Sequence, residues 1–209
     1  MRVKHKPWAK DYKEQSTSFI NKEDITSDLF INDNPVHLEL GMGKGEFLIT
    51  LAKQNPNINY IGIEVQLSAQ VMAAKKLEDE NLENIKLLNI DVKDLLEIEY
   101  LVNNIDVIYL NFSDPWPKNR HAKRRLTHIN FLNIYNDLLS DDGIIKFKTD
   151  NDILFESSIE NISLSNFIIE QVILDLHSHQ EIENIQTEYE KKFSQKGFKI
   201  KLIRLKKGK

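Results

Sequence analysis

VHLELGMGKG, residues 36–45, joins a short apolar strand to a loop with glycine at every second position. Leu48 and Leu51 then recur at the spacing of one helical face, and the pair Asn55 and Pro56 ends the helix. A strand, a glycine loop and a helix in this order form the first unit of a doubly wound α/β sheet. Such a unit predicts that a ligand binds at the glycine loop, beyond the carboxyl end of the strand.

The same alternation of strands and helices continues along the rest of the sequence. The expected strands cover residues 59–64, 85–90, 105–110, 144–149, 167–174 and 198–205, and the expected helices cover residues 67–77, 126–139 and 152–163. Strands separated by helices predict a Rossmann-like α/β fold with a doubly wound, mostly parallel sheet. The last two strands have no helix between them, so we expect one antiparallel edge strand, formed by residues 198–205.

Length and composition restrict the class of protein. The 209 residues suit one α/β domain, residues 35–209, preceded by a polar N-terminal arm, residues 1–34. The absence of cysteine from the sequence excludes disulfides, thiolate zinc sites and cysteine nucleophiles. The sequence has neither the apolar run of a membrane-spanning helix nor an apolar signal peptide at its start. We therefore expect a cytoplasmic protein that does not bind membranes.

Four acidic residues follow or close the first four expected strands: Glu39, Glu64, Asp91 and Asp114. Because ligands bind beyond the carboxyl ends of parallel strands, these carboxylates should border one pocket. Glu64 lies 19 residues after Gly45, where an acid can accept from both ribose hydroxyls of a nucleoside. Asp91 is placed to accept from an adenine amino group, although an acid at this point can equally cap the helix that follows.

The glycine loop and its preceding acid indicate which nucleoside cofactor binds. Gly41, Gly43 and Gly45 have the spacing G-x-G-x-G, whereas a pyrophosphate cofactor favours G-x-G-x-x-G. Glu39, directly before the loop, would repel a pyrophosphate but attract the cationic sulfonium or ammonium of S-adenosylmethionine. The charge pattern favours S-adenosylmethionine over NAD, with a plain strand-to-helix turn as the alternative to any cofactor loop.

Residues 111–126, NFSDPWPKNRHAKRRL, are the most informative stretch for the substrate. Each proline pushes the residue before it into an extended conformation, so Asp114 and Trp116 should lie in a stiff, extended loop. Trp116 is suited to stack on a base, and the cations from Lys118 to Arg125 are suited to phosphates. This combination predicts a nucleotide within a polymer as the substrate. The alternative is a proline-rich surface loop with a solvated basic face.

The charge distribution points the same way, although the net charge is -4. Residues 1–13, 118–125 and 190–209 hold 19 of the 28 basic residues and only two of the 32 acidic ones. If these segments converge in space, they form a basic face that can bind a polyphosphate on an otherwise acidic protein. For the first and last segments, the alternative is a pair of frayed, solvated termini.

The strings LELGMGKGEFL (38–48), IGIEV (61–65) and DPWPKNRHAKRRL (114–126) together resemble the tRNA (guanine-N7-)-methyltransferase family. The resemblance extends through GIIKFKTDN (143–151) to TEYEKKFSQKG (187–197), in the same order. Asn111, Phe112 and Ser113 depart from other members without affecting an essential position. The resemblance implies a class I methyltransferase fold and methylation of N7 of the variable-loop guanosine at position 46 of tRNA.

The resemblance also implies the residues of the site. The implied ligands of S-adenosylmethionine are Glu39, Gly41, Gly43, Gly45, Glu64, Asp91 and Asp114. The implied guanosine contacts are Lys118, Asp150, Thr187, Glu188, Tyr189 and Glu190. The implied RNA contacts are Arg120, His121, Lys123, Arg124 and Arg125. From the residues alone, Thr187 and Glu190 also fit a helix N-cap and its capping-box partner.

Guanine N7 carries an in-plane lone pair and no proton, so its methylation needs no general base. Because the reaction moves positive charge from sulfur to guanine, we expect Asp114 to be the catalytic residue. It would accept from the guanine N1 and N2 donors or neutralise the purinium. His177 and His179 form the one H-x-H pair, which we interpret as a surface feature; we expect no metal.

Three other functions compete with tRNA methylation. They are a methyltransferase acting on another RNA, a protein or a small molecule, a non-enzymatic RNA-binding module, and an NAD-dependent oxidoreductase. The basic run argues against a small substrate, the intact glycine loop argues against a decayed pocket, and Glu39 argues against NAD. The sequence leaves open whether the protein is a monomer or a homodimer.

Overall fold

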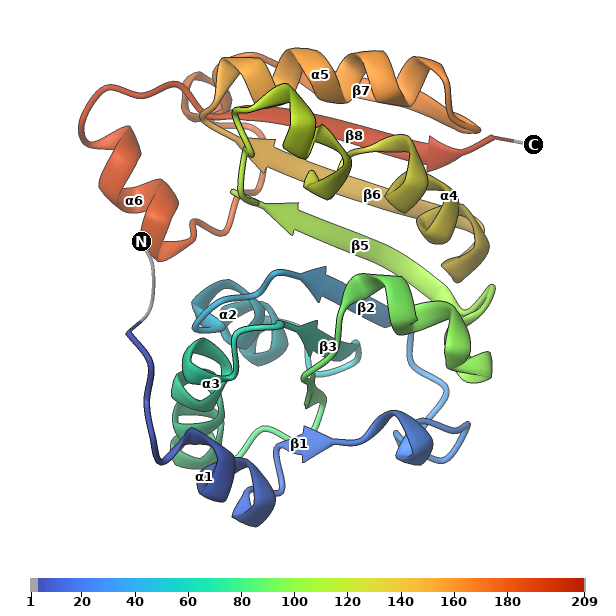
Figure 1. Ribbon diagram of the computed structural model, residues 1–209, viewed down its shortest axis with the longest axis vertical. Helices are drawn as coiled ribbons and strands as arrows, with labels where there is room; N and C mark the ends of the chain where they lie inside the picture. Colours follow the sequence, from blue (N-terminus) through green and yellow to red (C-terminus); the bar gives the residue numbers. More distant parts are fainter. Residues whose placement is uncertain (1–3, 209) are drawn as a thin grey trace.

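The computed structural model describes residues 4–208, which form one eight-stranded sheet in the order β1-β4-β3-β2-β5-β6-β8-β7 (Figure 1). The strands are β1 (Phe19–Ile20), β2 (Val36–Leu40), β3 (Asn59–Ile63), β4 (Ile85–Leu88), β5 (Ile105–Asn111), β6 (Leu139–Thr149), β7 (Phe167–Ile173) and β8 (Lys201–Lys207). The α-helices are α1 (Ala9–Gln15), α2 (Glu46–Gln54), α3 (Leu67–Glu80), α4 (Ile129–Leu138), α5 (Asp152–Ser163) and α6 (Glu188–Ser194). The 3-10 helices are η1 (Lys22–Asp24), η2 (Val92–Glu97), η3 (Glu99–Leu101), η4 (Asn119–Arg124) and η5 (Leu176–Ser178).

The sheet is mostly parallel, as predicted, and β8 is its one antiparallel strand, paired with both β6 and β7. The expectation that residues 198–205 form the edge is wrong, because β8 lies between β6 and β7. Leu202, Ile203 and Leu205 are buried, whereas five of the seven residues of β7 are exposed. The alternating basic residues of β8 misled the prediction, since long basic side chains can cover apolar surface while their charges reach water.

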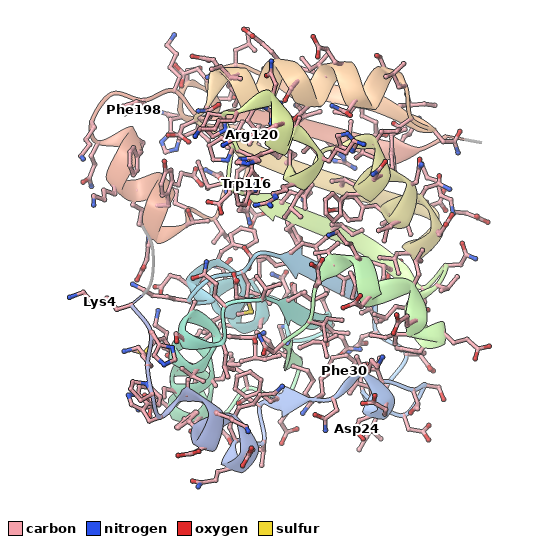
Figure 2. All side chains as sticks on the ribbon, viewed as in Figure 1. Lys4, Asp24, Phe30, Trp116, Arg120 and Phe198 are labelled. Carbon is pink, nitrogen blue, oxygen red and sulfur yellow. The ribbon has the colours of Figure 1, made fainter. Side chains whose placement is uncertain are left out.

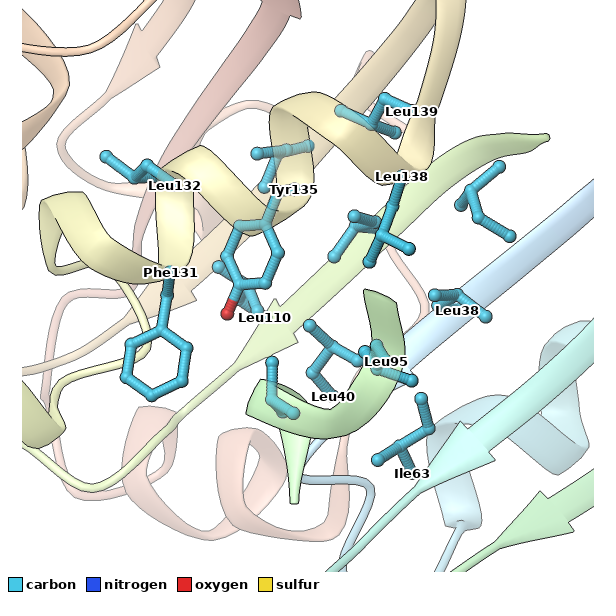
Figure 3. Close-up of a cluster of buried hydrophobic side chains, with 14 of the residues drawn as sticks. Leu38, Leu40, Ile63, Leu95, Leu110, Phe131, Leu132, Tyr135, Leu138 and Leu139 are labelled. Atoms are coloured by element: carbon cyan, nitrogen blue, oxygen red, sulfur yellow. The ribbon is translucent and has the colours of Figure 1, made fainter. Parts of the chain in front are cut away.

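Helices cover both faces of the sheet, and each face has its own apolar core. On one face, Leu38 and Leu40 of β2 pack with η2, α4 and α5; Figure 3 shows this cluster, including Phe131 and Tyr135 of α4. On the other face, Tyr60 of β3 packs with α2 and α3. The side chains of a strand alternate between its two faces, so Tyr60 and Ile61 of β3 supply different cores.

The described part of the N-terminal arm is continuous with the sheet. α1 packs on α3, where Tyr12 and Ser16 both donate hydrogen bonds to Glu78. β1 then adds a short parallel strand beside β4, and Phe30 joins the large core cluster that also contains residues of α4. None of the helices between residues 4 and 208 combines the length and the apolar character needed to span a lipid bilayer.

Candidate active site

A pocket of about 550 Å³ lies at the carboxyl ends of the central parallel strands. Its lining includes the glycine loop, three of the four predicted carboxylates and the loop after β5: Gly41, Gly43, Glu64, Asp91, Phe112 and Asp114. The carboxyl ends of β5 and β6 point toward α6 (Figure 1). The pocket therefore occupies the position that parallel-sheet topology predicts for a ligand.

The glycine loop needs its glycines for two different reasons. Gly43 has φ +56°, and a Cβ built there would meet no atom within 4 Å, so its backbone is open to the pocket. Gly45 has φ +73°, and a Cβ there would lie 2.7 Å from both Ala73 and Met42. The loop thus gives a ligand close access to the backbone at Gly43 and lets α2 pack against α3 at Gly45.

Glu64 and Asp91 are both held by backbone groups at the pocket wall. Glu64 accepts from the N–H of Gly43 at 3.0 Å and from the N–H of Gln66 at 2.8 Å. Asp91 accepts from the N–H of Lys93 at 3.0 Å, so it caps η2 while it also lines the pocket. The capping function and the ligand function of Asp91 are therefore compatible. Each carboxylate keeps further lone pairs for a ligand.

Glu39 is placed differently from the other three carboxylates. It is 3% exposed, does not line the 550 Å³ pocket, and accepts from Asn111 Nδ2 at 3.0 Å. Burial raises the pKa of Glu39 to about 8, although the Asn111 hydrogen bond and the charge of Lys148 oppose the shift. Its Oε2 atom is buried without a hydrogen-bond partner among the described residues. A nearby cation would satisfy this oxygen, which fits the ammonium of S-adenosylmethionine.

The loop after β5 is stiff, but it is not extended throughout. Phe112 and Trp116 have φ of +50° and +40°, so the expectation of an extended Trp116 is wrong. Arg125 explains how this strained conformation is held: its Nε donates to the carbonyl of Pro115 at 3.0 Å and its Nη2 to that of Trp116 at 3.1 Å. Asp114, between the two strained residues, is exposed at the pocket rim.

The basic run contains one buried and several exposed cations. Lys118, Arg120, Lys123 and Arg124 are exposed, and Arg124 lies 4.9 Å over the ring of Trp116. Arg125 is only 6% exposed and is occupied by the loop carbonyls. His121 meets Trp116 edge-on, with ring centroids 5.7 Å apart. Arg124 and His121 therefore already cover part of the tryptophan that was expected to stack on a base.

The TEYE segment comes back to the sheet beside Asp150. Tyr189 donates from its hydroxyl to Asp150 Oδ2 at 3.1 Å, and Thr187 caps α6 by accepting from the N–H of Glu190 at 2.9 Å. Glu188 is exposed and lies 3.5 Å from the ammonium of Lys44. Glu190 is fully buried, and its side chain does not return to the N–H of Thr187. The structure thus joins Asp150 with Tyr189 but turns Glu190 inward.

Lys118, the remaining predicted guanosine contact, lies at the exposed start of η4, and no hydrogen bond joins it to Asp150 or Tyr189. Figure 2 places Trp116 and Arg120 near the carboxyl end of β5, in the same half of the molecule as Lys4 and Phe198. The last basic segment does not stay on this side, because β8 runs toward the opposite end of the sheet, where Lys206 pairs with Ile144 (Figure 1).

A second pocket, of about 300 Å³, lies on the α2 face of the sheet under residues 182–185. Asn111 and Lys148 line it, whereas the glycine loop does not. Sequence reasoning missed Lys148, His177 and Asn184, which meet Glu190 at this place. The one feature of the sequence that could have indicated this cluster is the position of Lys148 within a strand of mostly apolar residues. Among residues 4–208, no group of three metal-ligating side chains is found.

The chain matches the family model described as "Putative methyltransferase" over residues 33–203. It is 47% identical over 204 residues to the tRNA (guanine-N(7)-)-methyltransferase of Macrococcus caseolyticus strain JCSC5402, covering 96% of this chain and 97% of that protein. It is 52% identical over 205 residues to the protein of the same name from Listeria monocytogenes serotype 4b strain F2365, covering 96% and 95%.

A solved structure titled an antibiotic-related methyltransferase shares the fold, with a TM-score of 0.68 at 20% identity and coverage of 93% and 97%. The fold and the carboxylate-lined pocket define a class I methyltransferase that uses S-adenosylmethionine, not an NAD-dependent oxidoreductase. Within that class, the chain belongs to the tRNA (guanine-N7-)-methyltransferase family.

Proposed function

We propose that this protein transfers the methyl group of S-adenosylmethionine to N7 of the guanosine at position 46 of tRNA. The enzyme class and the guanine N7 specificity follow from the family. The assignment of position 46 as the target is based on the resemblance of the DPWPK and RHAKRR strings to those of the family. The observation that supports the proposal best is a carboxylate-lined pocket whose rim continues into a loop with exposed cations.

Incubation with labelled S-adenosylmethionine and an unmodified tRNA transcript tests this function. We expect the label in N7-methylguanosine, and we expect a transcript with adenosine at position 46 to remain unlabelled. Label at another guanosine would move the target position. Label in a different nucleoside, or only in protein, would support a methyltransferase with another substrate.

Four carboxylates and the glycine loop fit the cofactor by charge and position. Bound S-adenosylmethionine supplies an electrophilic methyl group on a sulfonium. Glu64 accepts from the ribose hydroxyls, Asp91 from the adenine amino group, and Asp114 closes the rim. The loop from Gly41 to Gly45 offers its backbone at Gly43, where no side chain intervenes. Glu39 acts from behind this loop as a buried acid that attracts the ammonium group.

The guanosine lies, in our proposal, between the pocket rim and α6. Asp114 accepts from the guanine donor edge and stabilises the charge that develops on the purine. Asp150 and Tyr189 act as one hydrogen-bonded unit beside it, with Lys118, Thr187 and Glu188 around the opening. Because N7 carries no proton, alignment is the main contribution, and well-oriented reactions can gain roughly 7–11 kcal/mol in this way.

We predict that binding of S-adenosylmethionine releases roughly one proton from Glu39 at pH 7. With a pKa of about 8, Glu39 is mainly protonated at pH 7 in the free protein, and a bound cation favours its ionised form. Affinity should therefore rise between pH 6 and pH 8. Calorimetric titrations at pH 7 in two buffers of different ionisation enthalpy measure the released proton.

The Glu39→Gln variant is the matched control, since it keeps the size of the side chain and cannot titrate. Its binding heat should be the same in both buffers. Equal heats for the unmodified protein would show that Glu39 is not ionised by the cofactor. The pKa of the α-amino group of the ligand, near 8, limits the test to pH values below about 8.

We predict opposite behaviour for two neighbouring arginines. Arg124→Ala should weaken tRNA binding and lower the slope of log affinity against log salt by about 0.9, the value of one phosphate contact. Arg125→Ala should leave that slope unchanged, because its guanidinium binds loop carbonyls, and should reduce the transfer rate instead. Filter binding between about 50 and 200 mM salt measures the slopes. A reduced slope for Arg125→Ala would mean that Arg125 reaches the RNA.

For the surroundings of the enzyme, we propose a cytoplasmic location, tRNA as the partner, and either a monomer or a homodimer. The two edge strands are the two-residue β1 and the longer, exposed β7, so a dimer that extends the sheet would pair at β7 and not at β8. We further propose that residues 1–34 act as an arm of the domain formed by residues 35–209.

A further inference from the structure

A buried ion pair lies at the carboxyl end of β6, next to the active site. Lys148 Nζ is 2.7 Å from Glu190 Oε2, and the two side chains are 5% and 0% exposed. Isolated charges are costly to bury, so a pair in this position must be well compensated. Glu190 is also the one buried residue between residues 177 and 190. The chain segment that carries the TEYE string is therefore anchored to the sheet through a buried charge, in addition to the partly buried side chains of Ile182 and Ile185.

Both members of the pair are fully hydrogen-bonded. Lys148 Nζ also donates to Asn184 Oδ1 and to the carbonyl of Ile185, both at 3.0 Å, which occupies all three of its donors. On the other side, Glu190 Oε1 accepts from Asn184 Nδ2 at 2.6 Å and lies 2.9 Å from His177 Nε2. Lys148 thus holds three residues of the segment directly, and Glu190 in turn holds His177.

The charge states agree with this geometry. Burial lowers the pKa of Lys148, and Glu190 counteracts that shift. Burial acts to raise the pKa of Glu190, but Lys148 and the hydrogen bonds from Asn184 and His177 together hold it below its ordinary value. Glu190 is therefore a carboxylate whose oxygens are already used inside the protein.

Lys148 also contacts the elements of the active site. Its carbonyl accepts from the N–H of Phe112 at 2.9 Å, at the start of the loop that carries Asp114. Two residues further on, Asp150 accepts from Tyr189, the residue before Glu190. The ion pair and the Asp150–Tyr189 hydrogen bond therefore fix α6 against β6 from two neighbouring positions.

We propose that Lys148 is a positioning residue for the guanosine site, which acts by holding Glu190 and the segment 177–190 in place. Only the expected loss of methyl transfer to tRNA rests on the proposed function. According to this proposal, Glu190 holds Tyr189 and Thr187 at the opening of the guanosine site and does not itself contact guanine. Because hydrogen bonds are directional, a buried polar network of this kind fixes one position of the segment, whereas apolar contacts alone would allow it to shift.

Lys148→Met tests the proposal, with Lys146→Met as the matched control. Lys146 lies on the same strand and the same face, half-buried, without a hydrogen bond or ion pair to any residue from 4 to 208. We expect Lys148→Met to speed amide hydrogen exchange in residues 184–195 by at least about tenfold. Methyl transfer to tRNA should fall about 100-fold, since a misplacement of 1 Å can cost this much. The affinity for S-adenosylmethionine should fall much less than the transfer rate, because Lys148 does not line the 550 Å³ pocket and its charge acts on the cofactor only through Glu39.

Lys148→Arg should recover part of the transfer, and Glu190→Gln should reproduce the faster exchange. The double variant Lys148→Met with Glu190→Met should show less exchange than the sum of the single effects, because no unpaired charge stays buried. Unchanged exchange in Lys148→Met, additive effects in the double variant, or an equal change in Lys146→Met would overturn the proposal. Hydrogen exchange needs no tRNA, so a wrong substrate assignment would leave this result interpretable.

Discussion

Asp114→Ala should lose methyl transfer by about 100- to 1,000-fold while its affinity for S-adenosylmethionine falls far less. Asp114 is exposed at the rim, between the strained residues Phe112 and Trp116, so the fold presents its carboxylate outward. Carboxylates that face developing positive charge stabilise the transition state more than the ground state. Single-turnover transfer to tRNA, together with calorimetric cofactor binding, measures the two effects separately.

Asp91→Ala is the control for this experiment, because Asp91 lines the same pocket away from the loop after β5. It should weaken cofactor binding and leave the transfer rate at saturating cofactor nearly unchanged. If Asp114→Ala showed the same pattern as Asp91→Ala, Asp114 would be a cofactor ligand and no more. Asp114→Asn adds a third comparison, since it keeps one acceptor oxygen without the charge.

Glu64→Ala should weaken binding of S-adenosylmethionine by at least about 100-fold. Its two oxygens hold the backbone N–H groups of Gly43 and Gln66, and hydrogen bonds to charged groups contribute about 1.5–3 kcal/mol each. The substitution removes both the support of the glycine loop and the acceptor for the ribose. Calorimetric titration with the cofactor gives the change directly.

Glu64→Gln separates the two contributions, because an amide keeps one acceptor oxygen for the loop. We expect its affinity to lie between those of the unmodified protein and Glu64→Ala. If Glu64→Ala bound S-adenosylmethionine within about threefold of the unmodified protein, the assigned role would be contradicted. The loss of two hydrogen bonds should reduce the affinity by more than that. Thermal unfolding of both variants shows whether the loop defect extends to the whole fold.

The alternation of strands and helices was predictable from the sequence because its signals are local. The glycine loop, the helix at residues 152–163 and the apolar strand at residues 105–110 follow from spacing over a few residues. The order of β7 and β8 depends on which of the two strands pairs more favourably with β6, which is a long-range competition. β7 reads FIIEQVI, which is mainly apolar, whereas β8 alternates apolar and basic residues, so the sequence pattern alone favours the wrong strand for the edge.

The site shows the same division between local and long-range information. The positions of Glu64, Asp91 and Asp114 around one pocket were predictable, since each follows a strand whose end must lie at the same edge. The inward turn of Glu190 depends on Lys148, which lies 42 residues away in the sequence. The conformation of Trp116 depends on hydrogen bonds from Arg125. The general preference of a residue before proline for an extended conformation does not take such hydrogen bonds into account.

The place of β8 has a consequence for how the protein is made. β6 and β7 leave the ribosome before β8, and they are joined only through it. Until β8 is synthesised, the nascent chain carries unpaired backbone donors and acceptors along β6, together with the exposed apolar residues of β7. Such open strands invite association with other chains. We therefore expect translation pauses before residue 201 to favour aggregation, and chaperones to act mainly within that interval.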